Sequence, residues 1–306
     1  MSLKHSLIVP CYNEEGNVEK FLTETKAAMK DYTDSYEIIF VNDGSRDSTP
    51  KKLREIFLSN KDVNIKVINF SRNFGKEAAM YAGFMQAAGE YITIIDADLQ
   101  QDPKYAVEMA KILDSDPDCD MVAAYQAERK EGKLISACKG RFYKIITKMS
   151  GIDFVSDASD FRTMRKCVAD TIVALPEYHR FSKGIFSWVG YNTVSIPYEV
   201  RERESGETKW DMKKLIAYAF EGIMAYTDKP LRLPFYLSAF LLVLCVIWLL
   251  AEYVITATIC FVGALLMLTI GILGSYLGKV HTQVKDRPIF IAKEILTYES
   301  NQESDN

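Results

Sequence analysis

The chain has 306 residues, of which 48% are hydrophobic, and it carries a formal net charge of −4 at pH 7. This balance gives no reason to expect a nucleic-acid-binding protein, because such proteins present basic surfaces. The six cysteines form no Cys-x-x-Cys pair and only three histidines occur, which argues against a structural zinc site or a disulfide framework.

Short apolar runs alternate with helix-like stretches through the first half of the chain. The runs rich in β-branched residues predict strands at residues 6–10, 36–41, 65–70, 91–95 and 121–124. Amphipathic spacing predicts helices between them, at residues 18–29, 50–58, 76–88 and 103–113. Such alternation indicates an open, mainly parallel α/β sheet, in which ligands bind beyond the carboxyl ends of the strands.

The pattern is looser after Tyr125. Residues 133–149 have helical potential and are basic, and residues 193–197 are compatible with one more strand. Residues 211–226 place apolar positions behind a Lys213–Lys214 pair, which indicates an amphipathic helix. This helix lies at a membrane interface in one interpretation and packs on the preceding domain in the other. The polar tail at residues 299–306 has no apolar anchor.

Two long uncharged segments lie towards the carboxyl end. No charged side chain occurs at residues 234–251, and none occurs at residues 253–278. A helix that crosses a membrane needs about 20 predominantly apolar residues. We therefore predict a hairpin of two transmembrane helices, at about 233–251 and about 255–278. A pair of buried core helices is the alternative.

The cations around these segments predict their orientation. Lys229 and Arg232 precede the first segment, Lys279, Lys285 and Arg287 follow the second, and the connection between them has no Lys or Arg. The positive-inside rule then places both ends of the chain in the cytoplasm. The amino terminus has no apolar signal region, so we expect a cytoplasmic domain at residues 1–210. A juxtamembrane segment (211–232), the membrane hairpin (233–279) and a cytoplasmic carboxyl-terminal segment (280–306) follow.

Polar motifs follow three of the predicted strands, at residues 10–15, 42–47 and 96–100. Asp96 and Asp98 stand two residues apart where a strand ends, so both carboxylates can turn toward one point. Carboxylates so close repel each other unless a cation lies between them. Mg²⁺ and Mn²⁺ prefer oxygen ligands and are commonly held by one or two carboxylates plus substrate phosphates. The motif thus predicts a site for a metal-bridged diphosphate.

Other nucleotide-binding signatures are missing from the sequence. No Gly-x-Gly-x-x-Gly follows the first predicted strand, which weakens a dinucleotide-binding interpretation. No Gly-x-x-x-x-Gly-Lys-[Ser/Thr] occurs either, which argues against a P-loop ATPase. Of the ways in which a protein binds nucleotides, binding of a nucleoside diphosphate through a metal ion and carboxylates is the one that these absences leave.

The motifs VPCYNEE (9–15), VNDGSRDST (41–49), SRNFGKEAAMYAGF (71–84) and DADLQ (96–100) resemble the family-2 glycosyltransferases with the GT-A fold. More narrowly, the chain is similar to the polyprenyl-phosphate glycosyltransferases, the bactoprenol glucosyltransferase and dolichyl-phosphate mannose synthase groups. Later motifs extend the resemblance over nearly the whole chain: SDASDFRTMRK (156–166), RFSKGIFSWVGY (180–191), RERESGETKW (201–210) and KDRPIFI (285–291). These are much more specific than Asp-x-Asp alone.

The resemblance implies roles at the matching donor-side positions. The nucleotide sugar would be bound by Pro10, Tyr12, Asn13, Glu14, Asp43, Lys76, Asp96, Ala97 and Asp98, with Asp43 accepting hydrogen bonds from the base. Asp96, Asp98 and Gln100 would hold the Mg²⁺ or Mn²⁺ cofactor. Stabilisation of a helix amino terminus is the alternative role for Glu14 and for Asp47.

Asp157 and Asp98 are the candidate catalytic residues that the resemblance implies. A lipid phosphate is already anionic near neutral pH, so a strong general base is hardly required. Asp157 would then orient the acceptor or stabilise charge at the sugar carbon. Asp160 stands two residues before Arg162, and a structural ion pair is an equal alternative for it.

Basic residues are candidates for binding the acceptor phosphate, together with one hydroxyl: Arg129, Lys133, Ser136, Arg141, Arg203 and Lys209. Arginine suits bidentate contacts to phosphate, and lysine supplies a point charge. The alternative is attraction to anionic lipid headgroups, which is worth about 1 kcal/mol per cation near the surface.

The resemblance implies transfer of a monosaccharide, with UDP-glucose as the expected donor, to undecaprenyl phosphate with inversion. Membrane lipids, a flippase for the product and a second copy of the chain are the further partners expected by analogy. One alternative is a membrane glycosyltransferase that acts on a polysaccharide. The other is a non-catalytic nucleotide-sugar-binding partner of a flippase.

Overall fold

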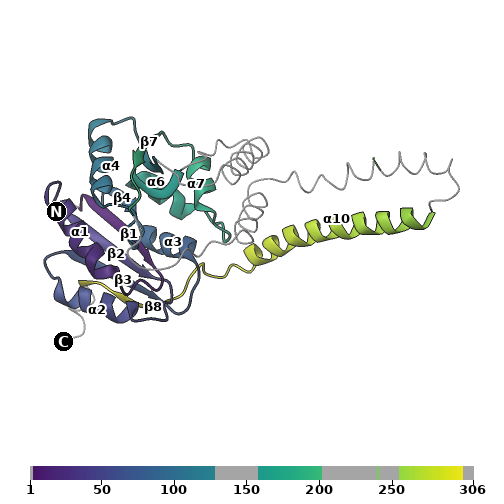
Figure 1. Cartoon of the computed structure of the whole chain (residues 1–306), viewed down its shortest axis with the longest axis horizontal. Helices are drawn as coiled ribbons and strands as arrows, with labels where there is room; N and C mark the ends of the chain where they lie inside the picture. The colour runs from purple at the N-terminus through teal and green to yellow at the C-terminus, as the bar shows by residue number, and fades with distance from the viewer. Residues whose placement is uncertain (1–2, 128–157, 202–239, 241–254, 299–306) are drawn as a thin grey trace. The chain divides into compact units, whose positions relative to one another are not determined.

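The computed structural model describes residues 3–127, 158–201, 240 and 255–298 (Figure 1). The chain divides into two compact units. Unit 1 holds Met1–Tyr143, Asp153–Lys209 and Pro288–Asn306, and unit 2 holds Lys144–Ile152 and Trp210–Arg287. The expected helices at 133–149 and 211–226 and the polar tail lie outside the described residues, as does the first predicted membrane segment apart from Phe240.

Unit 1 is built on an eight-stranded sheet with the order β7-β5-β6-β4-β1-β2-β3-β8. Its strands are β1 (His5–Cys11), β2 (Tyr36–Asn42), β3 (Asn64–Phe70), β4 (Tyr91–Ile94), β5 (Met121–Gln126), β6 (Ala158–Arg165), β7 (Thr193–Tyr198) and β8 (Ala292–Leu296). β1 pairs in parallel with β2 and β4, β2 with β3, and β5 with β7. β6 runs antiparallel to β4 and β5, and β8 runs antiparallel to β3. The mainly parallel sheet confirms the sequence-based prediction, which lacked β6 and β8.

Helices cover both faces of this sheet. They are α1 (Val18–Lys30), α2 (Thr49–Ser59), α3 (Lys76–Gln86), α4 (Lys104–Ser115), α6 (Lys166–Ala174) and α7 (Ser182–Trp188). α1 buries Phe21 and Met29 against the face of the sheet that includes Leu7, together with α2 and α4. α3 packs against the opposite face, where Gly83 leaves room for the side chain of Ile8. The burial of both faces explains the nearly continuous apolar runs of the central strands.

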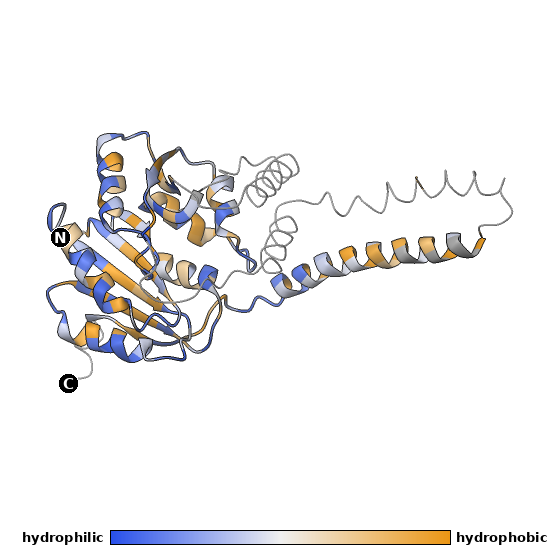
Figure 2. Cartoon of the chain, viewed as in Figure 1, coloured by the Kyte–Doolittle hydropathy of each residue, from blue (hydrophilic) through white to orange (hydrophobic). Residues whose placement is uncertain are grey.

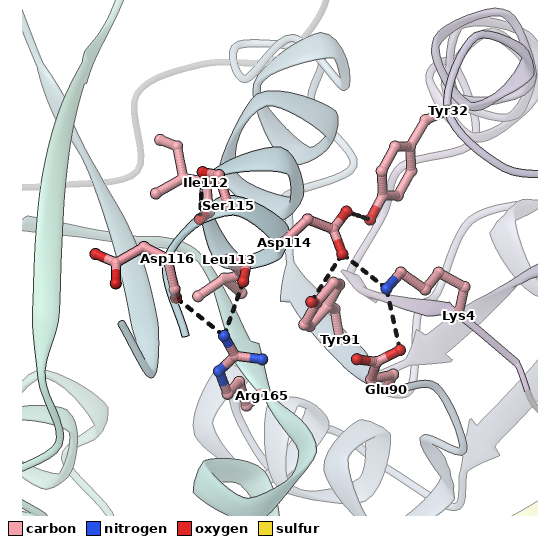
Figure 3. A network of polar contacts seen from close by, with 10 residues as sticks. All are labelled: Lys4, Tyr32, Glu90, Tyr91, Ile112, Leu113, Asp114, Ser115, Asp116 and Arg165. Atoms are coloured by element: carbon pink, nitrogen blue, oxygen red, sulfur yellow. Dashed lines mark hydrogen bonds and ion pairs between the residues drawn. The ribbon is translucent and has the colours of Figure 1, made fainter. Parts of the chain in front are cut away.

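A polar network ties the elements together near the amino ends of β1 and β4 (Figure 3). The Asp114 carboxylate at the end of α4 accepts hydrogen bonds from Lys4 Nζ at 2.8 Å, Tyr32 Oη at 2.8 Å and Tyr91 Oη at 2.9 Å. Burial raises the pKa of Asp114, but these three donors outweigh it and leave the pKa below its usual value. Arg165 donates to the backbone carbonyl of Leu113, in the last turn of α4, at 2.7 Å and to that of Asp116, just after the helix, at 3.1 Å. The network therefore stabilises the end of the sheet that lies opposite the carboxyl ends of β1 and β4.

Most of the described part of unit 2 is the helix α10 (Ile255–Val284). Its segment Phe261–Val284 has a mean hydropathy of 1.9 in its most apolar window, and none of that window is buried. Figure 2 shows the apolar residues distributed along this helix. Among the described residues, it is the one helix long and apolar enough to cross a membrane. The second predicted span is thus present as a helix, six residues longer than the predicted end at residue 278. The two-helix hairpin is not confirmed.

Candidate functional site

The carboxyl ends of β1, β2 and β4 lie at one edge of the sheet because these neighbouring strands are parallel. The three polar motifs of the sequence follow directly from these ends. β6 runs the other way, with Arg162 opposite Ile94. This register places Asp160, near the amino end of β6, at the edge where Asp96 follows β4.

The loops after β1 and β2 are hydrogen-bonded to each other. The Asn13 backbone has a φ of 57°, a left-handed conformation that asparagine tolerates better than most residues. Its N–H donates to Ser45 Oγ at 3.0 Å, and its side-chain Oδ1 accepts from the Arg46 N–H at 2.9 Å. The Glu14 N–H donates to Thr49 Oγ1 at 2.8 Å. The two loops therefore form one structural unit at the site.

The other residues predicted near this loop lie at its start and at its end. Pro10 is in β1, and Tyr12 follows that strand and is partly buried. The Glu14 carboxylate accepts a hydrogen bond from Asn17 Nδ2 at 2.6 Å, just before α1 begins. Glu14 thus organises the turn into α1, which agrees with the alternative role. Its contact with a nucleotide remains a prediction.

Asp43 is 4% exposed and holds the loop that leads into α3. Its two carboxylate oxygens accept hydrogen bonds from the N–H groups of Phe74 at 2.6 Å and Gly75 at 2.9 Å. Burial raises the pKa of Asp43, although these two bonds oppose the rise. Gly44 follows with a φ of 63°, and its α-carbon lies against the backbone of Arg72, which leaves no room for a side chain. Each carboxylate oxygen retains a further lone pair that can accept from a nucleobase.

Lys76 joins two acidic residues from different strand ends. Its ammonium lies 2.7 Å from Asp96 Oδ1 and 3.1 Å from Asp160 Oδ2. Burial lowers the pKa of Lys76, but the two carboxylates outweigh it and raise that pKa above its usual range. Asp96 and Asp160 therefore converge on one cationic group at the carboxyl edge of the sheet. The predicted contact of Lys76 with the donor would have to compete with this arrangement.

The sequence left two interpretations of Asp160 open, a role in the site and a structural ion pair with Arg162. The structure pairs the Asp160 carboxylate with Lys76. Burial raises the pKa of Asp160, but Lys76, Lys183 and Arg162 outweigh it and hold the pKa at about 2. The Arg162 guanidinium stacks 3.7 Å from the centre of the Phe186 ring, and burial lowers its pKa to about 10.

Glu77 connects α3 with α7 beside this cluster. The Ser182 N–H lies 3.1 Å from both carboxylate oxygens, and the Ser182 hydroxyl also donates to Oε2. Burial, with the charge of Asp160, raises the pKa of Glu77 to about 7, against the effect of the Ser182 bonds and Lys76. Glu77 thus holds the amino terminus of α7 close to Asp160.

The Asp-x-Asp motif forms a tight turn after β4. The Asp96 N–H donates to Gln101 Oε1 at 2.9 Å, and the Gln100 N–H donates to Asp98 Oδ1 at 3.2 Å. Ala97 is buried between the two aspartates, and Leu99 has a φ of 62°. Gln101, for which no role was predicted, therefore shapes this turn.

The oxygen ligands that this turn offers fit a divalent metal ion that is also bound by a substrate. Within the part of the chain that the structure describes, no group of three or more His, Cys, Asp or Glu side chains is arranged to hold a metal by itself. Asp96 and Asp98 supply the one or two carboxylates with which Mg²⁺ is usually bound alongside phosphate oxygens and waters. Gln100 contributes backbone groups to the local structure, where its carbonyl accepts from the Arg201 N–H at 3.1 Å.

The predicted acceptor side falls outside the described residues. This holds for the candidate catalytic Asp157 and for all six acceptor-phosphate candidates: Arg129, Lys133, Ser136, Arg141, Arg203 and Lys209. Asp157 directly precedes β6 in the sequence. The neighbouring Arg201 is described, and it binds Glu24 at 2.6 Å and also pairs with Asp102.

Sequence reasoning gave no role to Glu77 or Ser182, although they lie in the motifs SRNFGKEAAMYAGF and RFSKGIFSWVGY. It named Asp160 and Arg162, in SDASDFRTMRK, but not the residues that Asp160 meets in the folded site. What the motifs did not give was the antiparallel course of β6, which brings Asp160 toward Asp96.

Comparisons with known proteins agree with this geometry. Residues 6–172 match the family model described as glycosyl transferase family 2. The chain is 35% identical to CsbB of Bacillus subtilis (strain 168), over 94% of this chain and 91% of that protein. It is 33% identical to the bactoprenol glucosyl transferase of Shigella phage SfII, over 95% of this chain and 98% of that protein.

A solved structure supports the fold alone. The glucosyl-3-phosphoglycerate synthase of Mycobacterium tuberculosis, in complex with Mn²⁺, uridine-diphosphate and phosphoglyceric acid, aligns with a TM-score of 0.52 at 16% identity. The alignment covers 72% of this chain and 76% of that chain. With the family match, it confirms the predicted GT-A-like α/β fold.

Proposed function

Because this chain belongs to glycosyltransferase family 2, we propose that it transfers a monosaccharide from a nucleotide sugar to a polyprenyl phosphate. The name of the phage relative, a bactoprenol glucosyl transferase, supports a polyprenyl carrier and glucose as the sugar. UDP-glucose and undecaprenyl phosphate are the proposed substrates.

The observation that carries this proposal is the meeting of Asp96 and Asp160 on Lys76, beside the Asp-x-Asp turn. Charged groups of both signs are gathered at the edge of the sheet where ligands of such folds bind. A nucleoside diphosphate with a divalent cation also carries negative and positive charge, so its charges complement those of this cluster.

The donor would lie across the hydrogen-bonded loops after β1 and β2. Pro10, Tyr12, Asn13, Glu14 and Asp43 would surround the nucleoside, and Asp96 and Asp98, with Gln100, would hold Mg²⁺ or Mn²⁺ on the diphosphate. A bound metal supplies Lewis-acid stabilisation of the charge on the departing nucleoside diphosphate. Lys76 would place its positive charge close to the same diphosphate.

The acceptor phosphate would approach from the opposite side of the sugar. One of its oxygens forms a bond to the anomeric carbon, while the bond from that carbon to the nucleoside diphosphate breaks. This single displacement inverts the anomeric configuration and needs no proton acceptor, because the phosphate is already ionised. Asp157 would orient the acceptor or stabilise the charge at the sugar carbon, and the basic residues around Lys133 and Lys209 would bind the phosphate.

The apolar helix α10 supports an enzyme that works at a membrane, where a polyprenyl phosphate is found. We propose the two-helix hairpin, with the catalytic domain and both termini in the cytoplasm. A flippase that takes up the product and a homo-oligomeric state belong to the same proposal.

Binding of UDP to the full-length protein in detergent tests the donor side. With Mn²⁺ present, we expect Asp98→Asn to weaken UDP binding at least about tenfold, because loss of even a residue that supports a metal ligand costs about 10- to 100-fold in metal affinity. EDTA should weaken binding to the unsubstituted protein by a similar factor. Asp114→Asn, at the opposite end of the sheet, is the matched control and should bind UDP normally. UDP affinity that responds neither to EDTA nor to Asp98→Asn would contradict the proposed donor site.

A further inference from the structure

The strand β8 follows the membrane-length helix α10 along the chain and belongs to the sheet of unit 1. It pairs antiparallel with β3, so that Glu294 stands directly opposite Asn69. Just before β8, Phe290 stacks on Phe70 with 4.8 Å between ring centres. Just after it, Tyr298 Oη donates to the carbonyls of Phe57 at 3.1 Å and Asn60 at 2.8 Å. The segment is therefore held to β3 before the strand and to the carboxyl end of α2 after it.

A chain of hydrogen bonds runs from β8 across the carboxyl ends of β3 and β2. Asn69 Nδ2 donates to Glu294 Oε2 at 3.0 Å, and Asn42 Nδ2 donates to Asn69 Oδ1 at 2.9 Å. The Ser45 N–H then donates to Asn42 Oδ1 at 3.1 Å, and the Asn13 N–H donates to Ser45 Oγ at 3.0 Å. Each asparagine donates toward β8 and accepts from the side of the donor loops.

Because Asn42 and Asn69 are buried, the orientation of their side-chain amides is energetically important. Asn42 is 2% exposed and Asn69 is 8% exposed, and they face each other in the β2–β3 register. A buried amide that loses a partner is costly, so its orientation follows from which neighbours donate and which accept. The carboxylate of Glu294 can only accept, which requires that Asn69 turn its NH₂ group toward β8. The Asn69 oxygen is thereby presented to Asn42, and the Asn42 oxygen to the Ser45 N–H.

We propose that Glu294 is a positioning residue of the donor site. Through Asn69 and Asn42 it sets the conformation of the turn at 42–45, and through Ser45 it sets that of the loop at Asn13. Docking of β8 and the shape of the nucleotide-binding loops are then coupled, although β3 separates β8 from β2 in the sheet. That these loops bind a nucleotide rests on the proposed function, whereas the coupling itself does not.

Glu294 has a second partner, which permits a matched control. Its Oε1 pairs with Arg54 on α2, and the Arg54 and Glu294 side chains are 54% and 35% exposed. Exposed ion pairs contribute little to stability. Arg54→Ala therefore removes the ion pair and leaves the bond to Asn69 in place. Glu294→Gln keeps an amide oxygen that can accept from Asn69, whereas Glu294→Ala removes every acceptor.

Hydrogen exchange of the full-length protein in detergent measures the coupling without any ligand. In Glu294→Ala, we expect the amides of residues 13–15 and 43–48 to exchange severalfold faster than in the unsubstituted protein. Arg54→Ala and Glu294→Gln should exchange in these loops at nearly the original rate. Asp114→Asn controls for general loss of stability, because it acts at the opposite end of the sheet. Unchanged exchange of both loops in Glu294→Ala, with β8 still protected, would overturn the proposal.

UDP binding in the presence of Mn²⁺ then tests the consequence for the site. We expect Glu294→Ala to bind UDP about 5- to 10-fold more weakly, the size of effect that follows from one lost buried hydrogen bond. Glu294→Gln should restore most of that affinity. If the unsubstituted protein binds no UDP while the exchange result holds, the proposed function fails and the coupling stands. If Glu294→Ala exchanges faster but binds UDP as before, Glu294 is not a positioning residue of the donor site.

Discussion

At the scale of single residues, Lys76 occupies the position of a cation between two carboxylates. Its ammonium contacts Asp96 and Asp160, and Asp96 belongs to the proposed metal site. A metal that binds Asp96 must therefore displace Lys76 or share the carboxylate with it. A bound diphosphate offers the displaced ammonium a new anionic partner, so metal and donor would load together.

We predict that Lys76→Met increases the affinity for Mn²⁺ in the absence of nucleotide. Without the ammonium, the carboxylates repel each other and gain more from a divalent cation, and we expect about tenfold tighter binding on electrostatic grounds. Electron paramagnetic resonance of free Mn²⁺ provides the measurement. Lys104→Met is the control, because Lys104 lies 3.5 Å from Asp102 and does not contact Asp96. Equal Mn²⁺ affinity in Lys76→Met and the unsubstituted protein would show that Lys76 does not compete with the metal.

The position of the Asp-x-Asp motif could be predicted from the sequence, whereas the partner of Asp160 could not. Asp96 and Asp98 lie two residues apart at a strand end, and local spacing was enough to place them at the carboxyl edge of the sheet, while their binding of a metal remains a prediction. Asp160 and Arg162 are also two residues apart, and local spacing left an ion pair between them as one of two alternatives. The actual partner of Asp160 is Lys76, far away in the sequence, which only the pairing of β6 with β4 reveals.

At the scale of elements, Glu77 ties α3 to α7 through Ser182. Because burial and Asp160 raise the pKa of Glu77 from 4.5 to about 7, the folded protein favours the protonated carboxyl. Its contribution to stability is therefore full below about pH 4.5 and is lost as the pH rises through about 7.

We predict that Glu77→Gln flattens the pH dependence of stability between about pH 4.5 and about 7, the interval between the ordinary and the raised pKa. Thermal unfolding of the unsubstituted protein and the variant across this range gives the comparison. Glu55→Gln, on the exposed side of α2, should leave the slope unchanged. If Glu77→Gln retains the slope of the unsubstituted protein, another group is responsible for it.

The elements also show where pattern reasoning works. β1 to β5 were predicted because each is a run of apolar, often β-branched residues buried on both faces. β6 was missed because Asp160, Arg162 and Thr163 interrupt its apolar pattern, and these polar residues find partners only in the folded sheet. β8 was missed because it is a short edge strand, with one face exposed, in the sequence Ala292–Leu296. Its partner β3 lies more than 200 residues away in the chain, beyond the reach of any local signal.

At the scale of the whole molecule, the chain passes from unit 1 into unit 2, which differs from it in composition, and then returns to unit 1. The sheet unit carries the polar strand ends, and α10 carries the apolar surface. The sequence predicted the second apolar helix from the absence of charge over residues 253–278. It did not predict that the chain after this helix completes the sheet. The long apolar helix could be predicted because composition is a local property, whereas the return of β8 depends on pairing.

Transfer of sugar to a polyprenyl phosphate is the central claim. The most direct test incubates the detergent-solubilised protein with undecaprenyl phosphate, Mg²⁺ or Mn²⁺ and each of several radiolabelled sugar nucleotides, and counts the label that enters the organic phase. We predict label from one donor, with UDP-glucose the expected one, and loss of that label with EDTA and in Asp98→Ala. No labelled lipid from any donor, from protein that still binds UDP with metal, would contradict the claim and point to a polysaccharide acceptor or a non-catalytic partner of a flippase.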